Sequence, residues 1–164
     1  RETCGELSGR RLVFVGDGNN VARSLAIACG RMGVSMTLAA PRGYEFDEEF
    51  LGLLAEEVPG HDMRIESDPK AAVAEADVIY TDVWASMGQE SEKSKREAAF
   101  SGYQVNGELM SAAPASCRFM HDLPARRGLE VSDEVIDGPQ SVVFEQAENR
   151  MHLAKGLLVW LLDE

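Results

Sequence analysis

Short apolar runs alternate with longer amphipathic stretches along this chain, and this alternation restricts the possible folds more than any other feature. Five short runs have the character of buried strands, at Arg11–Val15, Ser35–Ala39, Met63–Glu66, Val78–Thr81 and Arg118–His121. The stretches between them carry apolar residues at the spacing of helix faces. Strands that alternate with helices are typical of a parallel sheet covered by helices. The sequence therefore predicts a doubly wound, Rossmann-like α/β fold with a five-stranded parallel sheet and helices on both faces.

Capping residues mark several of the expected helix boundaries. A helix over residues 20–31 stops before Gly33, Asp47 caps a helix that runs to about residue 57, and Asp68 with Pro69 opens a short helix. Further helices are expected at 90–100, 106–113 and 144–162. Right-handed crossovers favour the strand order 3-2-1-4-5, with a switch point between the first and fourth strands. Ligands bind at the carboxyl ends of the strands beside such a point.

Composition narrows the classes of function. The chain has 164 residues and a net charge of −12, which fits one globular domain and argues against binding to a nucleic-acid backbone. Three cysteines without metal-ligand spacing fit a reduced, cytoplasmic protein. The apolar run at 157–162 is too short to span a bilayer. The first ten residues read as the tail of a preceding segment, so we expect a part of a longer protein.

Polar loops of unusual composition follow the first, fourth and fifth expected strands. They read Gly-Asp-Gly-Asn-Asn at 16–20, Asp-Val-Trp-Ala-Ser-Met-Gly at 82–88 and His-Asp-Leu-Pro at 121–124. Because the carboxyl ends of neighbouring parallel strands meet at one edge of a sheet, we expect the loops to form one site. Asp82 and Ser86, brought together by a turn, can share one ammonium group, and the backbone N–H groups of Met87 and Gly88 can hold a carboxylate.

Plainer roles for the same residues stay open at this point. Asp17 and Asn19 can simply cap the turn and the following helix. Asp82 can be a solvated loop acid, and His121 a hydrogen-bonded structural residue. Arg150 stands among acidic residues, where an Arg usually forms a surface ion pair of little energetic value.

The first loop partly matches a dinucleotide-binding turn. Gly16 and Gly18 occupy the first two glycine positions of G-x-G-x-x-G, but Val21 stands at the third. Ala40 and Pro41 follow the second strand, where an acid would hold a ribose. We therefore expect no nicotinamide cofactor. Since no pair of His with acid has metal-ligand spacing, we expect no metal and no other cofactor.

Five strings, in one order and over nearly the whole chain, resemble ornithine carbamoyltransferase. They are FVGDGNNV at 14–21, TDVWASMGQE at 81–90, GYQV at 102–105, DGPQSVVF at 137–144 and AENRMH at 147–152. The Asp-x-x-x-Ser-Met-Gly string is specific to the ornithine-using members. The resemblance implies that residues 1–164 are the ornithine-binding domain of a transferase of arginine biosynthesis. Such an enzyme joins the δ-amine of ornithine to the carbamoyl group of carbamoyl phosphate and gives citrulline and phosphate.

The resemblance also implies how ornithine is held. Asn20 binds the α-carboxylate, together with the backbone N–H of Met87. Asp82 and Ser86 bind the α-ammonium group. These four residues come from the loops after the first and fourth expected strands.

Other roles implied by the resemblance concern the reacting groups. The carbonyl of Leu123 faces the carbamoyl NH2 and the reacting amine, and Arg150 binds carbamoyl phosphate and polarises its carbonyl. The family has Cys in the loop where this chain has Asp122. We treat Asp122 as a catalytic residue and hypothesise that it pairs with the δ-ammonium and raises the pKa of that group. Such pairing slows attack at neutral pH.

Two features of the sequence indicate a missing half. The chain contains neither a Ser-Thr-Arg-Thr nor a His-Pro-x-Gln string, and in the family these supply most contacts with carbamoyl phosphate. The last expected helix is apolar on nearly every side, whereas an isolated domain buries one stripe. The expected partners are ornithine, carbamoyl phosphate, an N-terminal domain outside this chain and two further copies in a homotrimer, without nucleic acid or membrane. The chain alone is expected to be inactive.

Two other functions stay open beside this one. A non-catalytic amino-acid-binding paralogue, or a carbamoyltransferase for a related amine, would be consistent with Asp122 in place of Cys. A nucleotide-binding domain is disfavoured by Val21 and Ala40.

Overall fold

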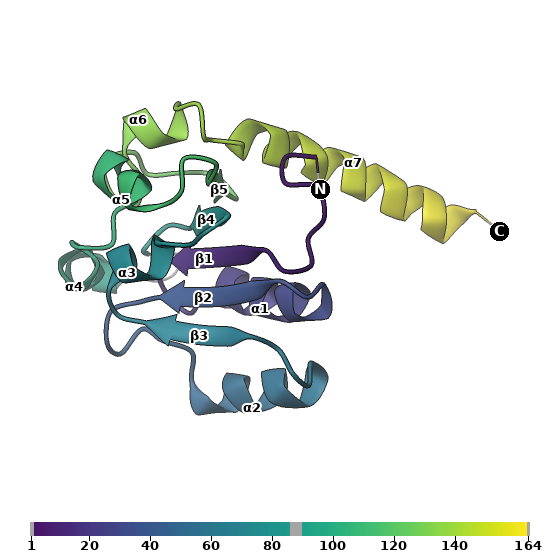
Figure 1. Cartoon of the computed structure of the whole chain (residues 1–164), viewed down its shortest axis with the longest axis horizontal. Coiled ribbons are helices and arrows are strands. Elements are labelled where there is room, and N and C mark those ends of the chain that lie inside the picture. The colour runs from purple at the N-terminus through teal and green to yellow at the C-terminus, as the bar shows by residue number, and fades with distance from the viewer. Residues whose placement is uncertain (1, 86–89, 164) are drawn as a thin grey trace.

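A single parallel sheet forms the centre of the molecule. The computed structural model describes residues 2–85 and 90–163. The strands lie side by side in the order β3-β2-β1-β4-β5, with their carboxyl ends at the same side (Figure 1). They are β1 (Arg11–Val15), β2 (Ser35–Ala39), β3 (Met63–Glu66), β4 (Val78–Thr81) and β5 (Arg118–His121). The predicted strands and the predicted order 3-2-1-4-5 are confirmed.

The connections between the strands contain the helices. Those described are α1 (Asn20–Arg31), α2 (Glu48–Glu57), α3 (Pro69–Val73), the 3-10 turn η1 (Glu90–Glu92), α4 (Lys93–Ala99), α5 (Gly107–Ala112), α6 (Asp133–Ile136) and α7 (Val143–Leu162). The predicted helix over 90–100 is thus a 3-10 turn followed by α4. The short helix α6 was not predicted, because four residues are too few to show an apolar period.

Alternate side chains of the strands point to opposite faces of the sheet and build two cores. Leu12 and Phe14 of β1 pack on one face with α1 and α2. Val13 and Val15 pack on the other face with α3, α5 and α6. Each fully buried side chain of this size contributes about 1.5–3 kcal/mol. The expectation of helices on both faces is therefore confirmed.

Helix α7 leaves the body of the molecule after its first turn. Val143 is buried, but the exposed fractions are 73% for Leu153, 74% for Trp160 and 78% for Leu162. Figure 1 shows the helix projecting beyond the sheet. The expected exposure of its apolar outer face is confirmed. Among the described residues, no helix is long and apolar enough to cross a membrane.

Candidate functional site

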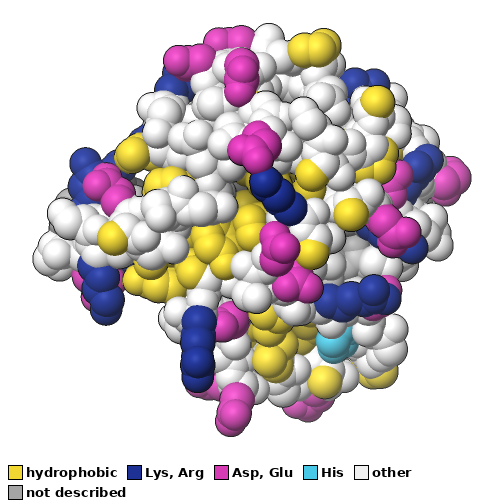
Figure 2. Space-filling view, turned by 60° about the vertical axis from the view of Figure 1, so that its left-hand side comes forward, with side chains coloured by type: hydrophobic (Ala, Val, Ile, Leu, Met, Phe, Trp, Pro, Cys, Tyr) yellow, Lys and Arg dark blue, Asp and Glu magenta, His cyan; other side chains and the backbone are white. Residues whose placement is uncertain are grey.

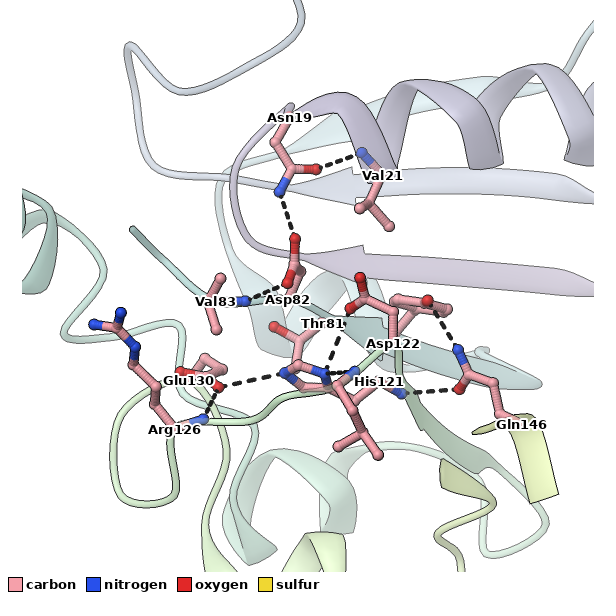
Figure 3. Close-up of polar contacts among 12 residues, drawn as sticks. Asn19, Val21, Thr81, Asp82, Val83, His121, Asp122, Arg126, Glu130 and Gln146 are labelled. Atoms are coloured by element: carbon pink, nitrogen blue, oxygen red, sulfur yellow. Dashed lines mark hydrogen bonds and ion pairs between the residues drawn. The ribbon is translucent and has the colours of Figure 1, made fainter. Parts of the chain in front are cut away.

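Asn19 joins the end of β1 to the end of β4. Its Oδ1 accepts hydrogen bonds at 3.0 Å from the N–H groups of Val21 and Ala22 and so caps α1. Its Nδ2 donates to Oδ2 of Asp82 at 2.9 Å (Figure 3). The capping role that the sequence left open is confirmed, and the same amide also orients Asp82. Because the other oxygen of Asp82 accepts from the N–H of Val83 at 2.7 Å, this acid is not freely solvated.

Asp17 forms a largely buried ion pair that the sequence did not reveal. Nη1 of Arg96, from α4, lies 2.5 Å from Oδ2 of Asp17 and donates to the carbonyl of Trp84 at 3.0 Å. The guanidinium also lies over the ring of Tyr44, 5.1 Å from its centroid. Arg96 therefore ties the loops after β1, β2 and β4 together. Its surroundings in the sequence are charged, so nothing local marks it as buried.

Gly18 is required by the packing of the first loop. Its N–H donates to the carbonyl of Tyr44 at 2.8 Å. A Cβ at this position would lie 2.9 Å from the backbone nitrogen of Phe46, closer than any side chain tolerates. The close approach of the loop after β2 explains this glycine without a bound pyrophosphate.

The loop after β5 is held by a buried His121–Glu130 pair. Nδ1 of His121 accepts from the N–H of Leu123 at 2.9 Å, and Nε2 lies 3.3 Å from Oε1 of Glu130. Because Nδ1 accepts, the proton of the neutral ring is on Nε2 and faces the Glu130 carboxylate. Oε1 of Glu130 also accepts from the N–H of Arg126 at 2.5 Å. His121 therefore has the structural role left open by the sequence, and it fixes the loop that contains Asp122.

Asp122 and Asp82 face each other at the ends of β5 and β4 (Figure 3). One carboxylate oxygen from each of Asp82 and Asp122 and one ring nitrogen of His121 lie within 4.8 Å of one another. Burial raises the pKa of the Asp122 carboxyl, and the charge of Asp82 and a hydrogen bond to it raise that pKa further. Two carboxyl groups in contact repel when both are ionised, so the pair favours a proton or a cation between them. Spacing along the chain could not indicate this cluster, because its members come from two strand ends.

A cavity with a volume of about 660 Å³ opens beside Asp122. Asp122, Leu123 and Arg150 contribute to its lining, together with the apolar side chains of Ile136 and Phe144. Nη1 of Arg150 lies 3.5 Å from the carbonyl oxygen of Asp122, and its side chain is exposed. Leu123 has a φ of 58°, a left-handed conformation that is uncommon for residues other than Gly, and its N–H donates to Nδ1 of His121. A cavity of this size is sufficient for a small ligand.

Gln146 attaches the first turns of α7 to the sheet. Its Oε1 accepts from the N–H of His121 at 3.1 Å, and its Nε2 donates to the hydroxyl of Tyr80 at 2.9 Å. Arg150 follows one turn later on the same side of the helix. Gln146 thus sets the position of Arg150 relative to Asp122. No local pattern marks this role, since both partners of Gln146 are distant along the chain.

The three other residues predicted to bind ornithine are Asn20, Ser86 and Met87. Asn20 is exposed at the first position of α1, beside the Asn19–Asp82 contact. Ser86 and Met87 lie outside the described residues.

Figure 2 turns the left-hand side of Figure 1, where the strands end, toward the viewer. It shows a hollow with hydrophobic side chains on its floor and acidic and basic side chains at its rim.

Comparison with known proteins decides the family. The model of "Aspartate/ornithine carbamoyltransferase, Asp/Orn binding domain" matches residues 8–161. The chain belongs to this family. The resemblance that the sequence strings indicated is thereby confirmed, and the fold agrees with that of the solved carbamoyltransferases.

Individual relatives in the carbamoyltransferase family are similar over almost the whole chain. The ornithine carbamoyltransferase of Methanobrevibacter smithii is 51% identical over 99% of this chain and 54% of its own length. For that of Methanothermobacter thermautotrophicus the identity is 51%, over 100% of this chain and 55% of the relative. The solved structure of the Pyrococcus furiosus ornithine carbamoyltransferase has a TM-score of 0.89 and 49% identity, covering 96% of this chain and 51% of that one. The chain spans about half the length of the curated relatives it matches.

Proposed function

We propose that this chain, residues 1–164, is the ornithine-binding half of an ornithine carbamoyltransferase. In the whole enzyme, the δ-amine of ornithine receives the carbamoyl group of carbamoyl phosphate, giving citrulline and phosphate in arginine biosynthesis. One observation carries the proposal. The facing carboxyl groups of Asp82 and Asp122 form a cation site at the strand ends, and the guanidinium of Arg150 lies beside it as an anion site.

The amino-acid end of ornithine lies at the ends of β1 and β4 in this proposal. Asn20 and the backbone N–H of Met87 bind the α-carboxylate, and Asp82 and Ser86 bind the α-ammonium. The position of Asn20 at the start of α1 supports its role, because free N–H groups and the helix dipole favour an anion there. The contact of Asn19 with Asp82 supports the other role, because it presents the carboxylate in a fixed orientation.

The reacting end of ornithine lies at the loop after β5. Asp122 pairs with the δ-ammonium, the carbonyl of Leu123 faces the carbamoyl NH2 and the amine, and Arg150 binds carbamoyl phosphate. The shared cavity of these three residues supports the assignment. Catalysis rests on orientation of the amine against the carbonyl and on the charge of Arg150 as negative charge builds on oxygen.

The other half of the enzyme packs against α7 in this proposal. Relatives are about twice as long as the matched region, and α7 exposes Leu153, Leu157, Trp160 and Leu162 to solvent. An apolar face of this length is larger than a monomer normally leaves uncovered. A homotrimer, carbamoyl phosphate contacts from the second half and a cytoplasmic location complete the proposal. The three free thiols agree with a reducing compartment.

Heat denaturation with candidate ligands tests the proposal on the chain itself. Ornithine is expected to raise the midpoint, because a ligand at 100 times its Kd stabilises by about 2.7 kcal/mol. Putrescine, which lacks the α-carboxylate, and NAD are expected to have little effect. Asp82→Asn should remove the ornithine effect, while Asp163→Asn, an exposed Asp at the end of α7, should retain it. Stabilisation by NAD and none by ornithine would overturn the proposal.

A second candidate function is a non-catalytic amino-acid-binding paralogue or a carbamoyltransferase for a related amine. Asp122 is the observation that favours it, because the family has Cys at this position. Citrulline formation separates the candidates. The full-length protein is expected to make citrulline, and the chain alone to make none. Ornithine binding without any citrulline from a folded full-length protein would favour the second candidate.

A further inference from the structure

The side-chain amide of Asn19 has different partners for its oxygen and its nitrogen. The oxygen accepts from the N–H groups of Val21 and Ala22 and caps α1. The nitrogen donates to Oδ2 of Asp82 at 2.9 Å, from the end of one strand to the end of the next (Figure 3). Capping accounts for the oxygen alone. The contact of the nitrogen with Asp82, 63 positions away, therefore points to a second role.

The start of α1 does not by itself require Asn at position 19. The backbone of Asn19 has a φ of −78° and a ψ of −174°, an extended conformation open to any residue. Ser and Asp cap helices about as well as Asn, and Gly nearly as well. Asn106, which caps α5, shows the difference. Its oxygen accepts from the N–H of Leu109 at 3.0 Å, but its nitrogen makes only a 3.4 Å contact with the side chain of Gln104.

The contact with Asn19 completes the fixation of Asp82. The buried hydroxyl of Thr81 donates to the carbonyl of Val15 at 2.6 Å and so joins the ends of β4 and β1. Oδ1 of Asp82 accepts from the N–H of Val83 at 2.7 Å. With Asn19 on Oδ2, each carboxylate oxygen has one donor, and the side chain is held in one orientation. Each oxygen also keeps acceptor capacity for a ligand.

The donor that Asn19 supplies carries no charge. A Lys or Arg at this place would form an ion pair with Asp82 and compete with a cationic ligand. A neutral amide orients the carboxylate and leaves its negative charge available. Asp122, which faces Asp82, adds to the negative charge that a ligand meets. An ammonium group that binds here does not have to order the carboxylate first, which lowers the cost of binding.

We infer that Asn19 is a positioning residue for the α-ammonium of ornithine: its amide nitrogen fixes the carboxylate of Asp82 and so makes the site selective for α-amino acids. The inference rests on the proposed function, in which Asp82 binds this ammonium, and adds the residue that prepares Asp82. Asn19 acts through Asp82 and not by contact with ornithine. The adjacent amides of Asn19 and Asn20 thus serve the two charges of the amino-acid group, one through a carboxylate and one directly.

Substitutions that keep the cap and remove the amide nitrogen test the inference. Asn19→Ser retains an oxygen for the cap, but this side chain is too short to cap α1 and reach Asp82 at once. Asn19→Gly has no side chain and still permits the helix to start. In the full-length protein, each variant is expected to raise KM for ornithine by about threefold to tenfold, the cost of ordering one side chain on binding. KM for carbamoyl phosphate and kcat at saturation are expected to stay within about twofold.

Two inhibitors identify the group of the substrate that Asn19 serves. Norvaline has the α-ammonium and lacks the δ-amine, whereas δ-aminovalerate has the δ-amine and lacks the α-ammonium. In Asn19→Ser, the inhibition constant of norvaline should rise as KM for ornithine does, while that of δ-aminovalerate should change by less than about twofold. Asn106→Ser, matched in residue type and in capping role, should leave all these constants unchanged. Heat denaturation confirms that each variant is folded.

The possible failures are distinct. A folded Asn19→Ser protein with an unchanged KM for ornithine would overturn the role of Asn19, and so would equal weakening of norvaline and δ-aminovalerate. If Asn19→Ser does not fold, the same two outcomes in Asn19→Gly decide. Either result would leave the proposed function intact. A folded, unchanged full-length protein that forms no citrulline would overturn the proposed function, and the inference with it.

Discussion

Replacing Arg96 by Met tests whether the buried ion pair with Asp17 holds the site together. The side chains of Arg96 and Asp17 are 9% and 17% exposed, so the substitution leaves a carboxylate largely without water or partner. Removing one member of a buried pair costs about 3–5 kcal/mol. The residual exposure of Asp17 places the expected loss at the lower end, at about 3 kcal/mol. The carbonyl of Trp84 also loses its donor.

A loss of this size is readily measured. Domains are stable by about 5–15 kcal/mol, and 1 kcal/mol moves the midpoint of a domain of this size by about 2–4 °C. Arg96→Met should therefore lower the midpoint by roughly 6–12 °C. Asp17→Asn in the same chain should recover part of the loss, because no unpaired charge is then left buried. Thermal denaturation followed by circular dichroism measures Arg96→Met, Asp17→Asn and the double variant.

A matched exposed pair serves as the control. Arg64 and Asp62 are 73% and 48% exposed, and exposed pairs contribute about 0–1 kcal/mol. Arg64→Met should therefore change stability by less than about 1 kcal/mol. If Arg96→Met cost no more than this control, or if the losses from Arg96→Met and Asp17→Asn simply added, the argument from burial would be refuted.

Three more predictions concern α7 and the thiols. Gln146→Leu should lower the free energy of unfolding by about 1–3 kcal/mol, because it leaves buried polar groups of the sheet unpaired. It should also speed proteolysis within α7. An unchanged rate of proteolysis would contradict the role of Gln146 in docking this helix. Leu157→Gln with Leu161→Gln should reduce self-association in sedimentation without lowering the thermal midpoint, since both side chains are at least half exposed. Burial raises the pKa of the Cys29 thiol to about 11 and that of Cys117 to about 12, so a thiol reagent at pH 8 should label one cysteine of three until the chain is unfolded. Because both values lie above 9.0, the ordinary value for Cys, the stability that the neutral thiols provide should be complete below about pH 9 and fall as the pH rises through 11 to 12.

The fold could be predicted from local signals, because an apolar run marks each strand and a capping residue or apolar spacing marks most helices. The Asp47 cap, for example, accepts from the N–H of Phe50 as an N-cap does. The loops at the strand ends were also predictable, since a parallel sheet brings its carboxyl ends to one edge.

What could not be predicted depends on contacts between distant residues. Arg96 is buried against Asp17, 79 positions away, and Gln146 binds Tyr80, 66 positions away. The contact of Asp122 with Asp82 is of the same kind. No period, cap or spacing along the chain reports such pairs.

The attachment of α7 by Gln146 has a consequence for the spacing of the two substrates. Gln146 binds β4 and β5, the two strands whose carboxyl ends carry Asp82 and Asp122. The turn of α7 that carries Arg150 is therefore positioned relative to these carboxylates by contacts within this chain. Under the proposed function, the spacing between the groups that bind ornithine and the Arg that binds carbamoyl phosphate would then be set by this half of the enzyme alone.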